Sequence, residues 1–168
     1  MAEDPHIVRT ARVDWDQAAW RGRHPFNPAS EMRILRLGAT AGLTRLGVNL
    51  VRVPPGKESF IPHAHTLQEE FVFVLEGAGE VALDGVAHPL APGDFVGFPT
   101  DGVAHVVRAT GPGELLYLTG GESGPVEISE FPTLGRTMVV RGGTMTLFGD
   151  GGVETLSAEA WLARTRIE

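Results

Sequence analysis

The chain of 168 residues contains no cysteine. This absence excludes disulfide bonds, thiolate nucleophiles, zinc knuckles and iron–sulfur clusters, because each of them needs a sulfur atom. Any metal ion must therefore be bound by histidine and carboxylate side chains. The length suits one compact domain with a hydrophobic core and is short for two, so we expect a single functional site.

Long apolar runs and an excess of positive charge are missing too. No run approaches the roughly 20 residues needed to cross a bilayer, and the chain starts without the basic flank and apolar stretch of a signal peptide. We therefore expect a cytoplasmic protein without a membrane partner. The formal net charge is −7, and no nucleic-acid partner is expected, because non-specific binding to nucleic acid or anionic lipid relies on a basic surface.

The 22 glycines and 12 prolines are spread between short apolar runs. This pattern is typical of an all-β chain with many short strands and tight turns. The clearest strand candidate is 70–75, and the run 79–84 is expected to form a hairpin with it. Asp84 and Gly85 suit a type I′ turn. Further strands are predicted at 46–53, 95–98, 103–109, 114–119, 137–141 and 144–148, the last two as a hairpin.

Helical structure is expected only near the two ends of the chain. Ser157 can cap a short amphipathic helix that carries Trp161. The N-terminal residues, with Trp15 and Trp20, are interpreted as an arm that packs its aromatic side chains on a body elsewhere. The single domain 1–168 would then consist of this arm at 1–32, a barrel core at 43–120, and a C-terminal hairpin and helix at 121–168.

Strand 70–75 is apolar on both of its faces. Alternation places Glu70 with the two valines on one face, and the two phenylalanines with Leu75 on the other. A closed barrel buries only its inner face, so the second face must be covered, or it would form an exposed apolar patch. A homodimer through this face is the preferred interpretation, and coverage by the N-terminal arm is the alternative.

Four residues have the types and spacing of metal ligands. His63 and His65 are two positions apart, so in an extended chain both imidazoles point the same way. The turn that follows lets Glu70 approach from the neighbouring strand. The fourth candidate is His105, because the glycines and the proline before it shape a turn that delivers it at the start of a strand.

The segments 56–77 and 93–109 resemble the paired motifs of the cupin superfamily. The first motif has a glycine, then His-x-His, a glutamate, six residues and a second glycine. Six residues separate Glu70 from Gly77, which selects Glu70 over Glu69 as the acidic ligand. Glu69 is expected to be a solvated or interface acid.

The second motif has a glycine, five residues, a proline, another glycine and a histidine. Here Pro99 follows Gly93 after five residues, and His105 takes the histidine position. The sequence departs from the family pattern at three places: six residues separate Gly56 from His63 where five are common, one extra residue lies between Pro99 and Gly102, and Ala109 replaces a terminal asparagine.

The resemblance implies a cupin double-stranded β-helix, a jelly-roll barrel with short terminal helices. It also implies one divalent transition metal ion per chain, bound by His63, His65, Glu70 and His105. The chain is most similar to bacterial one-domain cupins of the conserved-barrel type, whose reactions are unassigned. The ligand types do not choose among Fe, Mn, Ni, Co and Zn.

Three imidazoles and one carboxylate leave a divalent ion with a net charge near +1 and, in octahedral geometry, two open positions. This suits a small oxygen-rich molecule that binds through two atoms. We expect a metal-dependent oxygenase, isomerase or lyase, in which the ion polarises a carbonyl or, as Fe(II), activates dioxygen. The alternative is a non-catalytic barrel that binds a small ligand. Acids or bases in the cavity beyond the ligands would favour the enzyme, and a lining of only Val, Leu and Phe would favour the binder.

Two further residues are candidates for the cavity lining, and three histidines are not. Asn49 is a polar residue in an apolar strand, and Tyr117 could direct its hydroxyl into the barrel. His6, His24 and His88 lie in polar or proline-adjacent segments and are predicted to be surface residues. The sequence indicates no general base.

Overall fold

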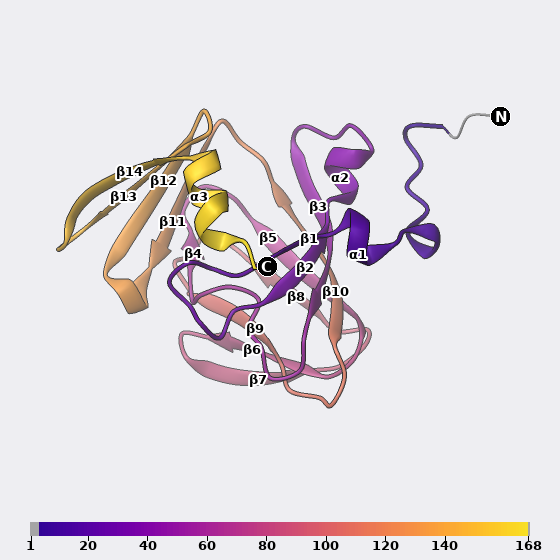
Figure 1. Cartoon of the computed structure of the whole chain (residues 1–168). Helices are drawn as coiled ribbons and strands as arrows, with labels where there is room; N and C mark the ends of the chain where they lie inside the picture. The colour runs from indigo at the N-terminus through magenta and orange to yellow at the C-terminus, as the bar shows by residue number, and fades with distance from the viewer. Residues whose placement is uncertain (1–3, 168) are drawn as a thin grey trace.

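Figure 1 shows the computed structural model, which describes residues 4–167. The first three residues and Glu168 lie outside this range, so the predicted arm and the argument against a signal peptide fall partly outside it. The described chain forms antiparallel sheets with short helices, as expected from the glycines and prolines that separate its short apolar runs. None of the helices in the described range has the length and apolar character that a membrane crossing requires.

The largest sheet forms one wall of the barrel. Its central strands pair over their full length, from Leu46 opposite Glu122 to Val53 opposite Leu115. The strand order is β1-β2-β3-β10-β5-β8. The strand bounds are β1 (Trp20–Gly22), β2 (Met32–Leu35), β3 (Leu46–Val53), β10 (Leu115–Glu122), β5 (Glu70–Glu76) and β8 (Phe95–Phe98).

A three-stranded sheet in the order β7-β6-β9 lies opposite (Figure 1). The predicted hairpin between 70–75 and 79–84 is wrong, because β5 pairs with β10 and β8, whereas β6 pairs with β7 and β9. The chain turns a corner between the sheets at Gly77, which has a φ of +87°. The turn at Asp84 and Gly85 is confirmed, with φ values of 48° and 83°. The bounds are β6 (Gly79–Leu83), β7 (Val86–Leu90) and β9 (His105–Ala109).

The C-terminal sheet has five strands in the order β14-β13-β12-β11-β4. The predicted C-terminal hairpin exists, but it is the centre of a meander whose outer strands the sequence analysis missed. β14 is mostly exposed and carries little apolar signal. β4 connects this sheet to the barrel motif, because its His65 pairs with Ser129 of β11. The bounds are β4 (Ala64–His65), β11 (Val126–Phe131), β12 (Arg136–Arg141), β13 (Thr144–Gly149) and β14 (Gly152–Ser157).

The helices are short. The C-terminal helix begins as predicted, with the Ser157 hydroxyl accepting a hydrogen bond from the Ala160 N–H at 3.1 Å. A one-turn helix at 37–40 was not expected and leads from β2 into β3. The bounds are α1 (Trp15–Ala18), α2 (Leu37–Thr40) and α3 (Ala158–Thr165), with 3₁₀ turns η1 (Thr10–Arg12) and η2 (Pro132–Leu134).

The two faces of β5 differ as the alternation predicts. Val72 and Val74 are buried in the barrel core, whereas Phe73 and Leu75 are 36% and 38% exposed. The N-terminal arm packs Trp15 over the outer side of β3 and β10. It leaves the outer side of β5 and β8 open, where Phe95 is 65% exposed. The arm thus covers one part of the outer face, and the homodimer through the other part stays a prediction.

Candidate metal centre

Four side chains from the two motif segments meet at one point. His63 precedes β4, His65 ends it, Glu70 begins β5 and His105 begins β9. Two backbone hydrogen bonds join the segments directly: the His63 N–H donates to the His105 carbonyl (3.1 Å), and the His105 N–H donates to the His63 carbonyl (2.8 Å). One ligand atom from each residue lies within 4.8 Å of the others. The fold therefore brings together the four side chains that the spacing singled out.

The polar contacts of two imidazoles indicate which ring nitrogen is free to bind a metal ion. His63 Nδ1 lies 2.7 Å from the Ile61 carbonyl oxygen, so it carries the proton and leaves a lone pair on Nε2. His65 Nδ1 lies 3.2 Å from Glu127 Oε1, while its Nε2 lies 3.1 Å from Glu70 Oε2. Both rings thus present Nε2 as the ligand atom. His63 is held from behind by its Nδ1 hydrogen bond, whereas His65 Nδ1 lies beside the Glu127 carboxylate at ion-pair distance without a well-aligned hydrogen bond.

The third imidazole is held by stacking. The His105 ring lies on the Phe98 ring, with centroids 3.7 Å apart and the planes at 10°. Its Nδ1 is buried without a hydrogen-bond partner among the described residues, whereas its Nε2 lies 3.6 Å from Glu70 Oε2. Nε2 is therefore the nitrogen that faces the cluster here as well.

Burial and mutual contact shift the pKa values of the cluster when no ion is bound. Burial, aided by the two neighbouring imidazoles, lowers the pKa of His63 to about 3. Burial also opposes the charged form of His65, but hydrogen bonds with Glu127 and Glu70 outweigh it and raise the pKa of His65 to about 9. Burial opposes ionisation of Glu70 as well, yet the contacts with His105 and His65 hold its pKa well below the usual range.

This donor set fits a divalent transition metal ion. Imidazole Nε2 atoms and one ionised carboxylate are the ligands such ions take in proteins without cysteine. The ion would neutralise the buried Glu70 charge and replace the proton that the high pKa of His65 retains at neutral pH. The cluster could therefore hold one metal ion, and its ligand types leave the identity of the ion open.

The cluster lies in the wall of a cavity of about 350 Å³. Both sequence candidates, Asn49 of β3 and Tyr117 of β10, line this cavity. Burial, together with the nearby Glu70 charge, raises the pKa of Tyr117 far above its usual value, so the hydroxyl keeps its proton and can donate. Thr119 Oγ1 lies 2.9 Å from Glu70 Oε1 and helps to fix the carboxylate.

The sequence analysis missed Glu127, the carboxylate behind His65. It lies on β11, where it shares a face with Ser129, whose hydroxyl donates to Glu127 Oε1 at 3.2 Å. Because Ser129 pairs with His65, this register places Glu127 beside the cluster. The sequence analysis did not recognise 126–131 as a strand. Its alternation would have placed Glu127 and Ser129 on one face, and this face lines the cavity.

The prediction for His24 is wrong, because this residue is only 1% exposed. Its ring packs between Phe60, at a centroid distance of 4.6 Å, and Trp161, at 5.7 Å. Burial among these rings lowers the pKa of His24 to about 4, so it is neutral at pH 7. The other two histidines, His6 and His88, are exposed as predicted.

A family model described as a cupin domain (Cupin_2) matches residues 49–120. A solved structure from Silicibacter pomeroyi, described as a sugar phosphate isomerase from a cupin superfamily, is 30% identical and has a TM-score of 0.76. The match covers 89% of this chain and 98% of that one. The chain belongs to the cupin superfamily. A second structure, from Acidithiobacillus ferrooxidans and described as a candidate sugar phosphate isomerase, is 28% identical, with a TM-score of 0.81 over 90% of this cupin and 97% of that chain.

Two curated relatives from Streptomyces match about half of this cupin. Protein SchB of Streptomyces halstedii is 46% identical over 83 residues, which are 48% of this chain and 57% of that protein. Polyketide synthase CurC of Streptomyces cyaneus is 37% identical over 81 residues, which are 48% of this chain and 51% of that protein. The cupin therefore spans little more than half the length of either relative.

Proposed function

We propose that this cupin is a metal-dependent enzyme that acts next to the carbonyl of a small hydroxy- or oxo-compound, as an isomerase does. The observation that carries the proposal is the position of the cluster in the wall of a cavity that also holds Asn49, Tyr117 and Glu127. Hydrogen-bonding groups beyond the four ligands are what a catalytic cavity needs and what a plain apolar binding barrel lacks. The names of the two isomerase structures support this choice over a lyase or an oxygenase.

Each residue of the proposed site has a separate task. His63, His65, Glu70 and His105 would hold a divalent ion, which supplies Lewis-acid polarisation of a carbonyl oxygen when it is bound. The protonated Tyr117 hydroxyl can donate a hydrogen bond to a second substrate oxygen, and the Asn49 amide can donate or accept one.

An isomerisation of a hydroxyketone breaks the C–H bond at the hydroxyl-bearing carbon and forms one at the former carbonyl carbon, while the hydroxyl proton passes to the former carbonyl oxygen. It therefore needs a group that takes up the proton and returns it. Outside the cluster, Glu127 is the carboxylate among the described residues that line the cavity, and it is available for this transfer. Its contact with His65 also makes it a positioning residue for the cluster.

Proton exchange with solvent tests the proposal directly. The cupin is loaded with Zn(II) or Mn(II) and incubated with hydroxyacetone in D₂O, and the loss of the carbon-bound proton signal is followed by NMR. We expect metal-dependent exchange above the buffer rate, lost on removal of the metal and in His63→Ala. The proton transfer assigned to Glu127 predicts the same loss in Glu127→Gln, and Glu130→Gln, on the opposite face of β11, is its matched control. Binding of the hydroxyketone without exchange for any metal would instead support the non-catalytic barrel.

A further inference from the structure

We infer that the ligand of this cavity has a chelating pair of oxygens at one end and an uncharged apolar body at the other, and that it carries no phosphate group. The chelating end rests on the proposed function. The apolar body rests on a separate observation, the apolar residues that line the same cavity.

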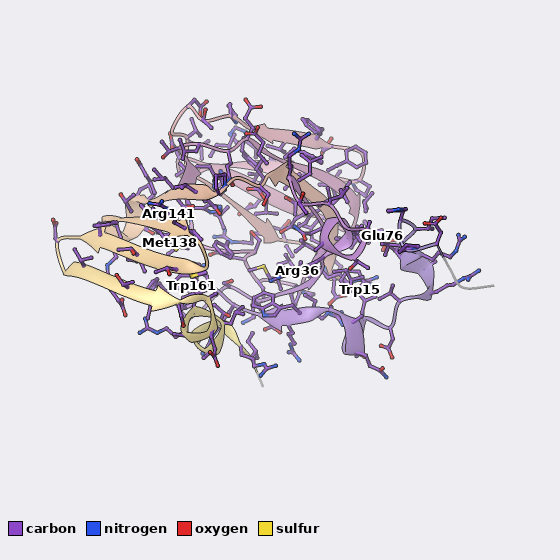
Figure 2. The ribbon with its side chains drawn as sticks, turned by 90° about the horizontal axis from the view of Figure 1, so that it is seen from above. Trp15, Arg36, Glu76, Met138, Arg141 and Trp161 are labelled. Carbon is purple, nitrogen blue, oxygen red and sulfur yellow. The ribbon has the colours of Figure 1, made fainter. Side chains whose placement is uncertain are left out.

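One set of these residues, called the apolar wall below, comes from four elements. It consists of Ile34 of β2, Met138 and Val140 of β12, Met145 of β13 and Trp161 of α3. Figure 2 shows Met138 and Trp161 on the side of the C-terminal sheet and helix. Both side chains are 7% exposed.

Methionine side chains are unbranched and polarisable, so they adapt to the shape of an apolar or aromatic partner. The Trp161 indole, which packs edge-on against His24 and Phe26, adds an aromatic side chain to this lining. A cavity of about 350 Å³ with such a wall has room beyond what two chelating oxygens and a short carbon chain would fill. The wall therefore fits an aliphatic or aromatic body.

The charge of the cavity argues against a phosphate group. Among the described residues, no lysine or arginine lines it, and Glu127 is its one acidic side chain outside the cluster. A phosphate dianion needs arginine, lysine or several N–H donors to compensate its charge. In this cavity it would lie near the Glu127 carboxylate, which repels it.

The arginines of β2 and β3 point away from the cavity. Arg33 of β2 and Arg52 of β3 both bind Glu114, at 2.7 and 3.1 Å. Arg52 also lies over the Trp15 ring of the N-terminal arm, 4.6 Å from its centroid, which places it on the outer face. The alternation of β2 and β3 thus directs positive charge away from the cavity. On β12, Arg136 shares the face of Met138 and Val140, but its guanidinium lies over the Phe26 ring, 5.6 Å from the centroid, and 3.8 Å from Glu154.

Three hydroxyketones with the same HO–CH₂–C(=O)– end separate the alternatives. Hydroxyacetone carries a methyl group there, α-hydroxyacetophenone a phenyl ring, and dihydroxyacetone phosphate a phosphate ester. Dissociation constants are measured by calorimetry on the Zn(II)-loaded full chain. We expect the phenyl compound to bind at least about tenfold more tightly than the methyl compound, because the ring buries apolar surface against the wall. We expect the phosphate compound to bind no more tightly than the methyl compound.

Three results would overturn the inference: tighter binding of the phosphate compound than of the phenyl compound, no advantage of phenyl over methyl, or no binding of any of the three. Met145→Lys adds a test within the wall, because a cation there should remove the phenyl preference and create phosphate binding. Met145→Leu keeps an apolar side chain of similar volume, so a change confined to the lysine variant reports the charge. The comparison on the wild-type chain stands even where the lysine variant fails to fold.

The same three hydroxyketones distinguish a failure of this inference from a failure of the proposed function. A phenyl preference without proton exchange refutes the enzyme and leaves the ligand class intact. Proton exchange with a preference for the phosphate compound refutes the ligand class and leaves the enzyme intact.

Discussion

Replacement of Glu127 by glutamine tests whether this carboxylate sets the metal affinity of the cluster. Glu127 Oε1 lies 3.2 Å from His65 Nδ1, and the ring presents its other nitrogen to the cluster. Glutamine places an uncharged amide oxygen beside Nδ1 in a side chain of the same size, so Glu127→Gln removes the charge and keeps a polar acceptor there. The difference between a charged and a neutral acceptor is about 1.4 kcal/mol, which is a tenfold loss of affinity.

The predicted loss of metal affinity depends on pH, because His65 carries a proton that metal binding must displace. The same carboxylate helps to raise the pKa of His65 to about 9, so at pH 7.5 metal binding must displace about one proton from this ring. Glu127→Gln lowers that pKa and weakens the competition from the proton. We therefore expect most of the tenfold loss near pH 9, a smaller loss near pH 6.5, and fewer protons released on metal binding at pH 7.5.

Two titrations measure these effects. Competition with a chelating dye across pH 6.5–9 gives the affinity, and calorimetry in buffers of different ionisation enthalpy gives the number of protons released. Glu130→Gln, with the same change in net charge on the opposite face of β11, should shift neither quantity measurably. The reasoning is refuted if Glu127→Gln and Glu130→Gln give the same affinities and the same proton release.

Three further predictions concern the fold around the site. The pKa of His24 falls to about 4 on folding, so the unfolded chain binds a proton below pH 6.5 that the folded chain excludes, and stability should drop by up to about 3 kcal/mol between pH 6.5 and 4. Urea titrations should show a flatter pH dependence in His24→Gln than in the wild type, whereas equal slopes would contradict this, and His88→Gln is the exposed control. Gly77→Ala should cost about 1–3 kcal/mol, because a Cβ there combines a φ of +87° with an overlap with the Glu114 carbonyl. Gly85→Ala, at a φ of +83° with open space around it, should cost less in the same assay, and an equal cost would argue against the overlap. Phe95→Asp should convert the predicted dimer to a monomer in sedimentation experiments, and a monomeric wild type would end the dimer interpretation.

Three members of the cluster could be predicted from the sequence because they lie close together in the chain. Extended spacing aligns His63 with His65, and a short turn brings Glu70 to them. His105 is distant in the sequence. The turn before it made it a candidate, and the resemblance to the paired family motifs linked it to the other three. The structure joins the two segments by the backbone pair between His63 and His105.

The remaining features depend on contacts that span the chain. Glu127 reaches the cluster only because β11 pairs with β4, and His24 is buried only because α3 and the Phe60 segment close over it. The hairpin prediction failed for a related reason. Two strands joined by a short glycine turn look alike in the sequence whether they pair or turn a corner between two sheets, and Gly77 does the latter.

Metal content is the most direct test of the central claim that His63, His65, Glu70 and His105 hold one metal ion. The protein is purified without an affinity tag or chelator, as wild type and as the double variant His63→Ala with His105→Ala. The account predicts near one equivalent of a divalent transition metal per wild-type chain, and its loss in a double variant that keeps the β-sheet circular dichroism spectrum. A wild-type chain that binds no metal, even after reconstitution with Fe(II), Mn(II) or Zn(II), would contradict it.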